Sequence, residues 1–399
     1  MKVFFVTLFE AQNIKNWSGT AFYLSKSLQE AGVEVEYIGN LKSLPGNDLR
    51  FRLRDLFYNK LFKNKFGTYI RFYEPRNLQY IAGQVSEKLK NKQGIVLSPG
   101  AIPIAYLKTN MPVVLWTDAT FAVMKDYYSE FMGLSSRTIK NCNAYEKKVL
   151  TRSDLSIFSS DWAAQSAIND YGADPARVKV ISYGANIECD RTFDSIIENN
   201  NKKSKDTCKL LFVGQDWERK GAEAAVAVAK ELNNRNIKTE LTIVGCEPPP
   251  GTPLPGYIKV KGFIKKSEKA GAELMDSLYA ESHFFILPTL AECTPIVFSE
   301  ANSFGLPVLT TDTGGISSII VNDINGRMFG PQLNIAACVA YIIQFHTNVE
   351  NYNEFSLSAF KEYMTRLNWQ TSIAKSLSYM KDLSKAEANN TIPNSPRVS

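Results

Sequence analysis

The stretch LFVGQDWERKG, residues 211–221, joins an apolar run to a loop that ends in two cations and a glycine. The apolar run is typical of a buried strand, and the residues after Gly221 have the spacing of a helix over 222–232. Backbone amides at the start of such a helix, with Arg219 and Lys220 beside them, favour a bound diphosphate. The alternative is a solvated Arg-Lys turn, and this stretch alone does not decide between the two.

Short apolar runs alternate with helical or turn sequence on both sides of this stretch. This alternation predicts parallel sheets covered by helices. Downstream, the pattern predicts strands at 241–244, 257–260, 284–287 and 308–310. Upstream, it predicts strands at 2–9, 33–38, 94–97, 113–116, 155–158 and 178–181.

The chain length and one polar stretch predict two domains, because 399 residues exceed one comfortable hydrophobic core. We expect an α/β protein with two Rossmann-like domains whose parallel sheets face a central ligand cleft. The expected parts are a first domain over 1–190, a linker over 191–207, a second domain over 208–365, a helix over 366–384 that packs back on the first domain, and a disordered tail over 385–399.

The composition is typical of a globular protein, with 44% hydrophobic and 22% charged residues. No stretch approaches about 18 uninterrupted apolar residues, which a membrane-spanning helix needs. The apolar start of the chain meets Glu10 at once, so a buried strand is a better interpretation than a signal peptide. The six cysteines are scattered without a CxxC pair, which predicts free thiols in a reducing compartment. We therefore expect a cytoplasmic protein, with the option of peripheral contact on the inner face of the membrane.

A second block, LPTLAECTPIVFSEA at 287–301, carries two glutamates separated by seven residues. Glu292 lies in the loop after a predicted strand, where its carboxylate could bind sugar hydroxyls, and Glu300 lies in the helix that follows and could accept from ribose hydroxyls. Pro295 suits the first turn of that helix, and the amides of Cys293, Thr294 and Ile296 are expected to point towards the same space. The alternative is a capping glutamate and a surface one.

A third block, GLPVLT at 305–310 followed by TGG at 313–315, permits close backbone approach to a ligand or forms a plain tight turn. In this order and spacing, the three blocks resemble glycosyltransferase family 4, whose members are retaining enzymes of the GT-B fold with an E-x7-E motif. The resemblance is strong over 210–330. It extends weakly over 1–190 through Gly19-Thr20, Ser160-Asp161-Trp162 and the YGAN stretch at 183–186.

The resemblance implies a role for each matching position. Lys220, with Arg219 as helper, would hold the diphosphate, while Glu292 would bind the donor sugar and Glu300 the ribose. The remaining donor-binding positions that the resemblance implies are Gly19, Thr20, Gly214, Gln215, Phe263, Ile264, Cys293, Thr294, Pro295 and Ile296. Of these, Phe263 is a candidate stacking partner of the nucleobase.

The chain departs from the family pattern at two positions. Gln215 stands where arginine is frequent, and Thr117 stands where histidine commonly precedes an aspartate. Asp118 remains and is a candidate acceptor-side or sugar-contacting group. The resemblance implies front-face attack without a covalent nucleophile, a metal or another cofactor. The two histidines, His283 and His346, lack metal-ligand company and are interpreted as structural.

Residues 50–76 interleave eight cations with eight aromatic side chains, against the two acids Asp55 and Glu74. This excess of six equals the formal net charge of +6 of the whole chain. Three interpretations remain open: contact with an anionic membrane surface, binding of an anionic acceptor such as a lipid-linked diphosphate sugar, or a half-buried excursion whose aromatics pack inward while its cations are solvated. Nucleic-acid binding uses the same ingredients but is not expected beside the sugar-transfer motifs.

The expected function is transfer of a hexose-type sugar, with retained anomeric configuration, from a nucleoside diphosphate to a hydroxyl acceptor. The acceptor would be a glycan, a glycolipid or a lipid-linked saccharide, in surface polysaccharide or glycoconjugate synthesis. The alternatives are a non-catalytic sugar-nucleotide binding protein and a GT-B sugar-nucleotide epimerase.

Overall fold

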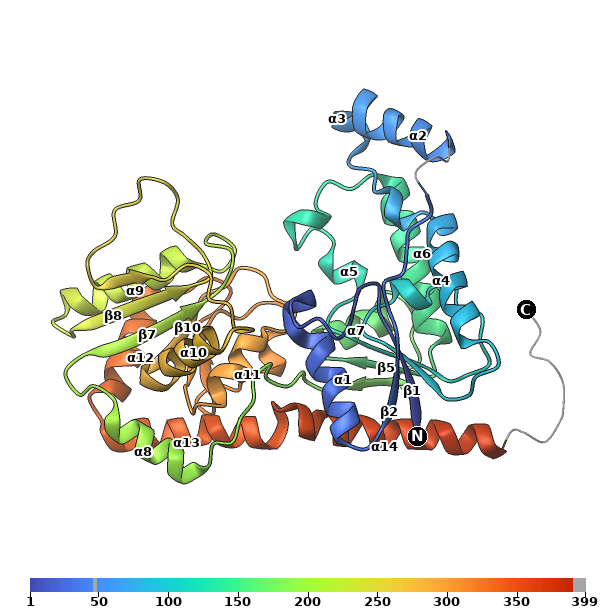
Figure 1. Cartoon of the computed structure of the whole chain (residues 1–399). Coiled ribbons are helices and arrows are strands. Elements are labelled where there is room, and N and C mark those ends of the chain that lie inside the picture. The colour runs from blue at the N-terminus through green and yellow to red at the C-terminus, as the bar shows by residue number, and fades with distance from the viewer. Residues whose placement is uncertain (46–48, 390–399) are drawn as a thin grey trace. The chain divides into compact units, whose positions relative to one another are not determined.

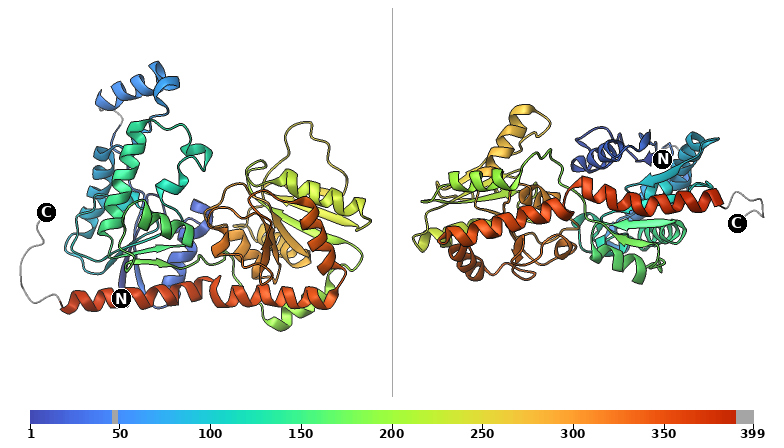
Figure 2. Two further views of the ribbon diagram at one scale, coloured as in Figure 1. Left: turned by 180° about the vertical axis from the view of Figure 1, so that it is seen from behind. Right: turned by 90° about the horizontal axis from the view of Figure 1, so that it is seen from below.

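The computed structural model describes residues 1–45 and 49–389 (Figure 1). The chain forms two compact units, which we describe separately. Unit 1 comprises Met1–Ile181 together with the chain from Ile373, and unit 2 comprises Ser182–Ser372. In both units, helices flank the two sides of a sheet (Figure 2).

Unit 1 is built on a parallel six-stranded sheet in the order β2-β1-β3-β4-β5-β6. The strands β3 and β5 are buried along their whole length, as expected for apolar strands covered on both faces. The edge strand β2 carries Glu34 and Glu36, and both pair with Lys2 of β1. The strands are β1 (Lys2–Val6), β2 (Glu34–Ile38), β3 (Ile95–Ser98), β4 (Val113–Thr117), β5 (Leu155–Phe158) and β6 (Val178–Val180).

Three of the longer helices of unit 1 begin at residues that favour a helix start. Pro75 occupies the first turn of α4, and the side chains of Ser135 and Ser160 accept from Thr138 N and Ala163 N at the starts of α6 and α7. The longer helices are α1 (Thr20–Glu30), α4 (Pro75–Leu89), α6 (Ser136–Arg152), α7 (Asp161–Asn169) and α14 (Trp369–Asn389), of which α14 begins in unit 2. Shorter elements are α2 (Leu49–Asp55), the π-helical turn η2 (Leu56–Leu61), α3 (Lys63–Phe66) and α5 (Phe121–Met124).

Unit 2 repeats the design with the strand order β12-β11-β10-β7-β8-β9, again all parallel. The predicted α/β fold with two parallel-sheet units is therefore confirmed. The edge strand β12 was not expected, because its three residues include Gly326, which weakens a strand signal. The strands are β7 (Cys208–Val213), β8 (Thr239–Val244), β9 (Ile258–Val260), β10 (Phe284–Leu287), β11 (Val308–Thr310) and β12 (Gly326–Met328).

The stretch 191–207, expected to be a linker, contains a helix that belongs to unit 2. The helix α8 (Phe193–Lys202) begins with a capping box formed by Thr192 and Ser195. Its polar residues are held by unit 2, since Asn200 Nδ2 donates to Ser356 Oγ at 2.9 Å and Lys203 Nζ donates to the Tyr352 hydroxyl at 2.8 Å. The other helices of unit 2 are α9 (Ala222–Asn234), α10 (Lys269–Glu281), α11 (Ile296–Asn302), α12 (Ile335–His346) and α13 (Val349–Arg366).

The helix expected at 366–384 corresponds to α14, which begins at Trp369 and continues through Asn389. From Ile373 onward it belongs to unit 1, where Lys375 Nζ donates to Val180 O at 3.4 Å. The expected disordered tail over 385–399 thus begins within this helix, and residues 390–399 lie outside the described residues. No helix within 1–45 and 49–389 is long and apolar enough to cross a membrane.

Candidate functional site

The loops that follow β7 and β10 bring two cations onto one carboxylate in unit 2. The Lys220 ammonium forms an ion pair with Glu292 Oε1, and Arg219 Nη1 lies 3.5 Å from the same oxygen. Glu292 is buried and the Lys220 side chain is 14% exposed, so the ion pair is largely removed from water. The structure thus brings the two blocks of sequence together in one cluster, which consists of Arg219 and Lys220 from the first block and Glu292 from the second.

The cluster is held by hydrogen bonds between the two loops. Asp216 Oδ1 accepts from Arg219 N at 2.9 Å, which fixes the turn before α9. Arg219 O accepts from Leu290 N at 2.8 Å and from Thr289 Oγ1 at 3.1 Å, and Arg219 Nη1 donates to Ala291 O at 2.9 Å. Arg219 therefore links the loops through both its backbone and its guanidinium.

Gly221 allows the backbone to pass close to the end of β10. Its φ is +75°, and a Cβ at this position would overlap the carbonyl oxygen of Pro288. Gly214 likewise lies against the Lys220 side chain, whose Cγ would be 2.9 Å from an added Cβ. The glycines on both sides of the loop thus permit the position that Lys220 occupies.

We expect Gly221→Ala to lower the free energy of unfolding by about 2 kcal/mol more than Gly251→Ala does, because only the first adds steric overlap to the unfavourable φ. Gly251 is the matched control, since its φ is +80° and nothing lies within 4 Å of an added Cβ. Thermal unfolding of the two variants measures the difference. Equal melting temperatures would show that the Pro288 contact relaxes without cost.

Burial lowers the pKa of the Lys220 ammonium, and the neighbouring charge of Arg219 acts in the same direction. The Asp216 carboxylate acts in the opposite direction because a nearby negative charge favours the protonated amine. The two cations face two carboxylates, since Arg219 Nε also lies 3.6 Å from Asp216 Oδ2, so the ammonium and guanidinium are held in place by opposite charges. An anionic ligand that approached Lys220 and Arg219 would meet little competing water.

Glu300 lies on α11, as expected, and is 1% exposed. Its carboxylate accepts from the Tyr279 hydroxyl at 2.9 Å and forms an ion pair with Lys266, which lies in the loop after β9. Neither partner was anticipated, because Tyr279 and Lys266 belong to other elements and no spacing connects them to Glu300. In the same loop, Phe263 is 65% exposed and Ile264 is half-buried.

The other predicted donor-side positions surround these loops. Gln215 is exposed in the turn after Gly214. Cys293 and Thr294 are buried, Pro295 is the N-cap of α11, and Ile296 is its first residue.

Gly19, Thr20 and Asp118 lie in unit 1. Trp17, Ser18 and Gly19 have φ values of 47°, 53° and 83°, so three consecutive residues adopt the left-handed conformation directly before α1. Such strain is concentrated at functional sites. Thr20, the first residue of α1, is buried.

Asp118 lines a cavity of about 260 Å³ in unit 1, at the carboxyl ends of β1, β3 and β4. Burial raises the pKa of its carboxyl, while the backbone N–H groups of Asp118 and Ala119 act in the opposite direction. The wall is otherwise largely apolar, with Phe9 and Trp17 among its members. A partly desolvated carboxyl in an apolar cavity at strand ends is suited to bind a hydroxyl.

His283 and His346 approach each other in unit 2, where their ring nitrogens and Cys208 Sγ lie within 4.8 Å of one another. Both ring nitrogens of His283 are already engaged: Nδ1 accepts from Lys209 N at 3.0 Å, and Nε2 lies 3.0 Å from Ser204 O. Burial lowers the pKa of His283 to about 3 and raises that of the Cys208 thiol. The expectation that the histidines lack metal-ligand company is therefore wrong, because they come together with Cys208 from distant parts of the sequence. The hydrogen bonds of His283 fit a hydrogen-bonded core better than a metal centre.

Comparison with known structures defines the fold. Sucrose-phosphate synthase from Thermosynechococcus elongatus superposes with a TM-score of 0.68 at 15% sequence identity, over 97% of this chain and 100% of that chain. HepE from Anabaena in complex with UDP-glucose gives a TM-score of 0.59 at 14% identity, over 95% and 100% of the two chains. The protein has the GT-B fold.

Sequence comparison concentrates on unit 2 of this GT-B protein. Residues 193–362 match the family model described as Glycosyl transferases group 1, a range that contains Lys220, Glu292 and Glu300. A D-inositol 3-phosphate glycosyltransferase from Gordonia bronchialis is 27% identical over 207 residues, which is 46% of this chain and 43% of that protein. One from Corynebacterium diphtheriae is 22% identical over 236 residues, 54% and 53% of the two chains. The chain thus spans about half the length of the curated relatives it matches.

Proposed function

We propose that this protein is a retaining glycosyltransferase that moves a hexose-type sugar from a nucleoside diphosphate to a hydroxyl acceptor. The observation that carries the proposal is the buried cluster of Lys220, Arg219 and Glu292, which lies within the range that matches Glycosyl transferases group 1. The E-x7-E spacing of Glu292 and Glu300 further supports assignment to glycosyltransferase family 4.

In this proposal, the diphosphate of the donor binds at Lys220 and Arg219. As the bond between the anomeric carbon and the β-phosphate oxygen breaks, negative charge develops on the leaving diphosphate. Fixed cations in a site with little water stabilise that charge most strongly in the transition state. The binding of the diphosphate beside Lys220 would release Glu292 from its ion pair to accept from hydroxyls of the sugar.

With the diphosphate at Lys220 and Arg219, we assign the ribose and the nucleobase of the donor to neighbouring residues. Glu300 accepts from ribose hydroxyls and shares them with Lys266, while the exposed ring of Phe263 stacks on the nucleobase. Gly19 and Thr20, at the start of α1, are two further proposed donor-binding residues. The acceptor hydroxyl attacks the face from which the diphosphate departs, its oxygen bonds to the anomeric carbon, and its proton passes to the departing phosphate oxygen. This sequence retains the anomeric configuration and requires neither a covalent nucleophile nor a metal.

The acceptor side is assigned to the cavity that contains Asp118. The Asp118 carboxyl lies in the wall of this cavity, where it can accept a hydrogen bond from a sugar hydroxyl. The curated relatives from Gordonia bronchialis and Corynebacterium diphtheriae are named D-inositol 3-phosphate glycosyltransferases. For this chain, we propose a glycan, a glycolipid or a lipid-linked saccharide in surface polysaccharide or glycoconjugate synthesis.

A panel of nucleotide sugars tests the donor assignment by thermal shift. A donor at 100 times its dissociation constant is expected to add about 2.7 kcal/mol to the free energy of unfolding. If no nucleotide sugar in the panel raises the melting temperature, the donor site is wrong. Release of nucleoside diphosphate with a mixture of glycan and lipid-linked acceptors then identifies a transferase, because a pure binding protein or an epimerase releases none.

A further inference from the structure

The segment from Leu49 to Phe66, here called the α2–α3 segment, is attached to unit 1 through polar contacts (Figure 1). Arg54 Nη1 donates to Glu74 Oε2 at 3.0 Å. Asn59 Nδ2 donates to Tyr69 O at 2.8 Å, and Asn59 Oδ1 accepts from Tyr69 N at 2.9 Å. Among the large apolar side chains of the segment, Phe51 is buried, with the Arg71 guanidinium 4.6 Å from its ring centroid.

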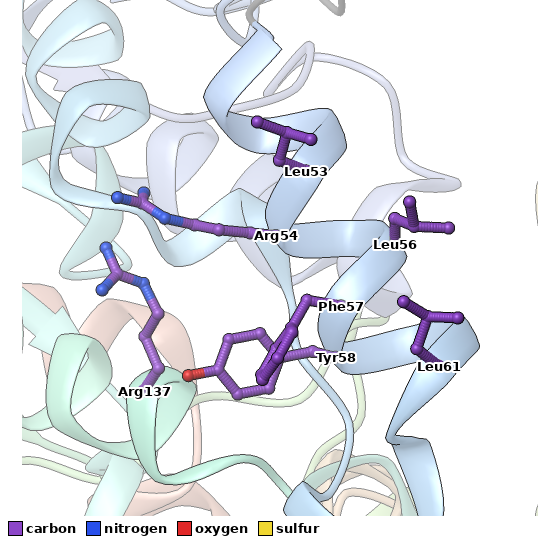
Figure 3. A pocket seen from close by; sticks show the side chains of 7 residues that line it. All are labelled: Leu53, Arg54, Leu56, Phe57, Tyr58, Leu61 and Arg137. Atoms are coloured by element: carbon purple, nitrogen blue, oxygen red, sulfur yellow. The ribbon is translucent and has the colours of Figure 1, made fainter.

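The apolar side chains of the segment are mostly on its exposed side. Leu53 is 57% exposed and Leu61 is 63% exposed, values that are unusual for leucine in a helix that packs on a domain. Figure 3 shows Leu56 and Leu61 pointing away from Arg54 and Arg137. The exposed large apolar residues are Leu49, Leu53, Leu56, Phe57, Leu61, Phe62 and Phe66. Large apolar side chains and cations therefore share the solvent-facing side of the segment.

The exposed charges of the segment are all positive. Arg50, Arg52, Lys60 and Lys65 are exposed, whereas the one acid, Asp55, is half-buried and accepts from Asn59 Nδ2 at 2.9 Å. The described side chains of the segment thus present apolar groups and cations to solvent and no exposed acid. This combination complements the surface of an anionic lipid bilayer, which has an apolar interior and negatively charged headgroups. The surface of a protein of average composition carries charges of both signs and would not match these cations as uniformly as anionic headgroups do.

A cavity of about 550 Å³ adjoins this surface and, like it, is lined by apolar side chains and by cations. Apolar side chains of the segment form most of its wall, and the guanidiniums of Arg54 and Arg137 close one side (Figure 3). Both arginines are held by Glu74, which is 2% exposed, so this buried carboxylate fixes their positions. A lipid headgroup phosphate, with its acyl chains beside the leucines, matches this combination of groups.

We propose that the α2–α3 segment docks unit 1 on an anionic lipid bilayer. Leu53, Phe57 and Leu61 enter the boundary between headgroups and acyl chains, while Lys60 and Lys65 contact lipid phosphates. The segment lies in the interface and does not span the bilayer, because α2 and α3 have only seven and four residues. This docking does not depend on the transfer reaction, since vesicle binding is measured without donor or acceptor.

Flotation of the full chain with lipid vesicles tests the proposal. We expect binding to phosphatidylcholine vesicles that contain 40% phosphatidylglycerol, and at least tenfold weaker binding to pure phosphatidylcholine vesicles or at 0.5 M salt. The triple variant Leu53→Ser, Phe57→Ser, Leu61→Ser should lose at least tenfold in affinity. The double variant Lys60→Gln, Lys65→Gln should lose several-fold.

Leu274→Ser is the matched control, because Leu274 is an exposed leucine, 41% accessible, on α10 of unit 2. It should bind vesicles as the unaltered protein does. Absence of binding to the anionic vesicles, or unchanged binding of both multiple variants, would overturn the proposal. Loss of a dimer in the triple variant, without vesicle binding by the unaltered protein, would identify a second copy of the chain as the occupant instead. Because these vesicles contain no sugar-carrying lipid, binding to them also separates the bilayer from a lipid-linked acceptor.

Discussion

Lys220→Ala is expected to lower the turnover of a nucleotide sugar about 10²- to 10³-fold, which is the usual effect of removing one preorganised group that stabilises developing charge. Lys220 is the closest cation to Glu292, and its side chain is largely buried. Loss of the ammonium removes a charge that faces the proposed leaving diphosphate and leaves Arg219, whose Nη1 is 3.5 Å from Glu292 Oε1, as the remaining cation. Because the effect is expected in the transition state, kcat should fall more than KM rises.

Two further variants sharpen this experiment. Lys230→Ala removes an exposed lysine of α9 outside the cluster and should leave turnover unchanged. Glu292→Gln retains the shape of the side chain but removes its charge, so it should also lower turnover strongly. The assay measures nucleoside diphosphate released per unit time, with the melting temperature of each variant as a check on folding. If Lys220→Ala and Glu292→Gln both turn over within twofold of the unaltered protein, the assigned roles are wrong.

Much of this site could be predicted because its residues lie in short blocks directly after buried strands. The four residues of β10 are fully buried, and their apolar run predicts both the strand and the position of the loop that carries Glu292. The same reasoning places Lys220 after β7. The partners of Glu300 could not be predicted, since Lys266 and Tyr279 reach it from the loop after β9 and from α10. Such contacts depend on how the elements pack, which no local pattern specifies.

The segment 50–76 shows a second limit of sequence reasoning. Its cations and aromatics interleave, but the order of residues does not determine which side faces the protein. The structure buries Phe51 and Tyr69 and exposes Phe57, Phe62 and Phe66. Of the three interpretations left open by the sequence, the one in which the aromatics pack inward thus fits only part of the segment. The count of charges also does not reveal that Arg54 is paired with the buried Glu74, whereas Arg50, Arg52, Lys60 and Lys65 are exposed.

Glu74 organises this part of unit 1, and its replacement is the second change for which we expect a large effect. Its carboxylate accepts from Arg137 Nη2 at 2.9 Å, from Arg54 Nη1 at 3.0 Å and from the Tyr69 hydroxyl at 3.0 Å. Burial alone would raise the pKa of Glu74, but the hydrogen bonds from Arg137 and Tyr69 outweigh it and hold the pKa below its usual value. Ionised Glu74 therefore connects α6, the α2–α3 segment and the start of α4.

Glu74→Gln is expected to lower the free energy of unfolding of unit 1 by about 3 kcal/mol at pH 7, because removal of the charge leaves two arginines without their buried partner. Since the folded pKa of Glu74 lies below its unfolded value, its contribution is fully present above the unfolded pKa and is lost as pH falls through the folded pKa. The difference in the free energy of unfolding between the unaltered protein and the Glu74→Gln variant should therefore become smaller as the pH falls below about 4.5.

Glu87→Gln, at an exposed position of the same helix α4, is the control and should lower the free energy of unfolding by less than about 0.5 kcal/mol. Thermal unfolding at pH 7 and pH 4, with amide hydrogen exchange over 49–74, measures both effects. A destabilisation by Glu74→Gln that does not change between these pH values would mean that the charge of Glu74 is not what holds the α2–α3 segment in place.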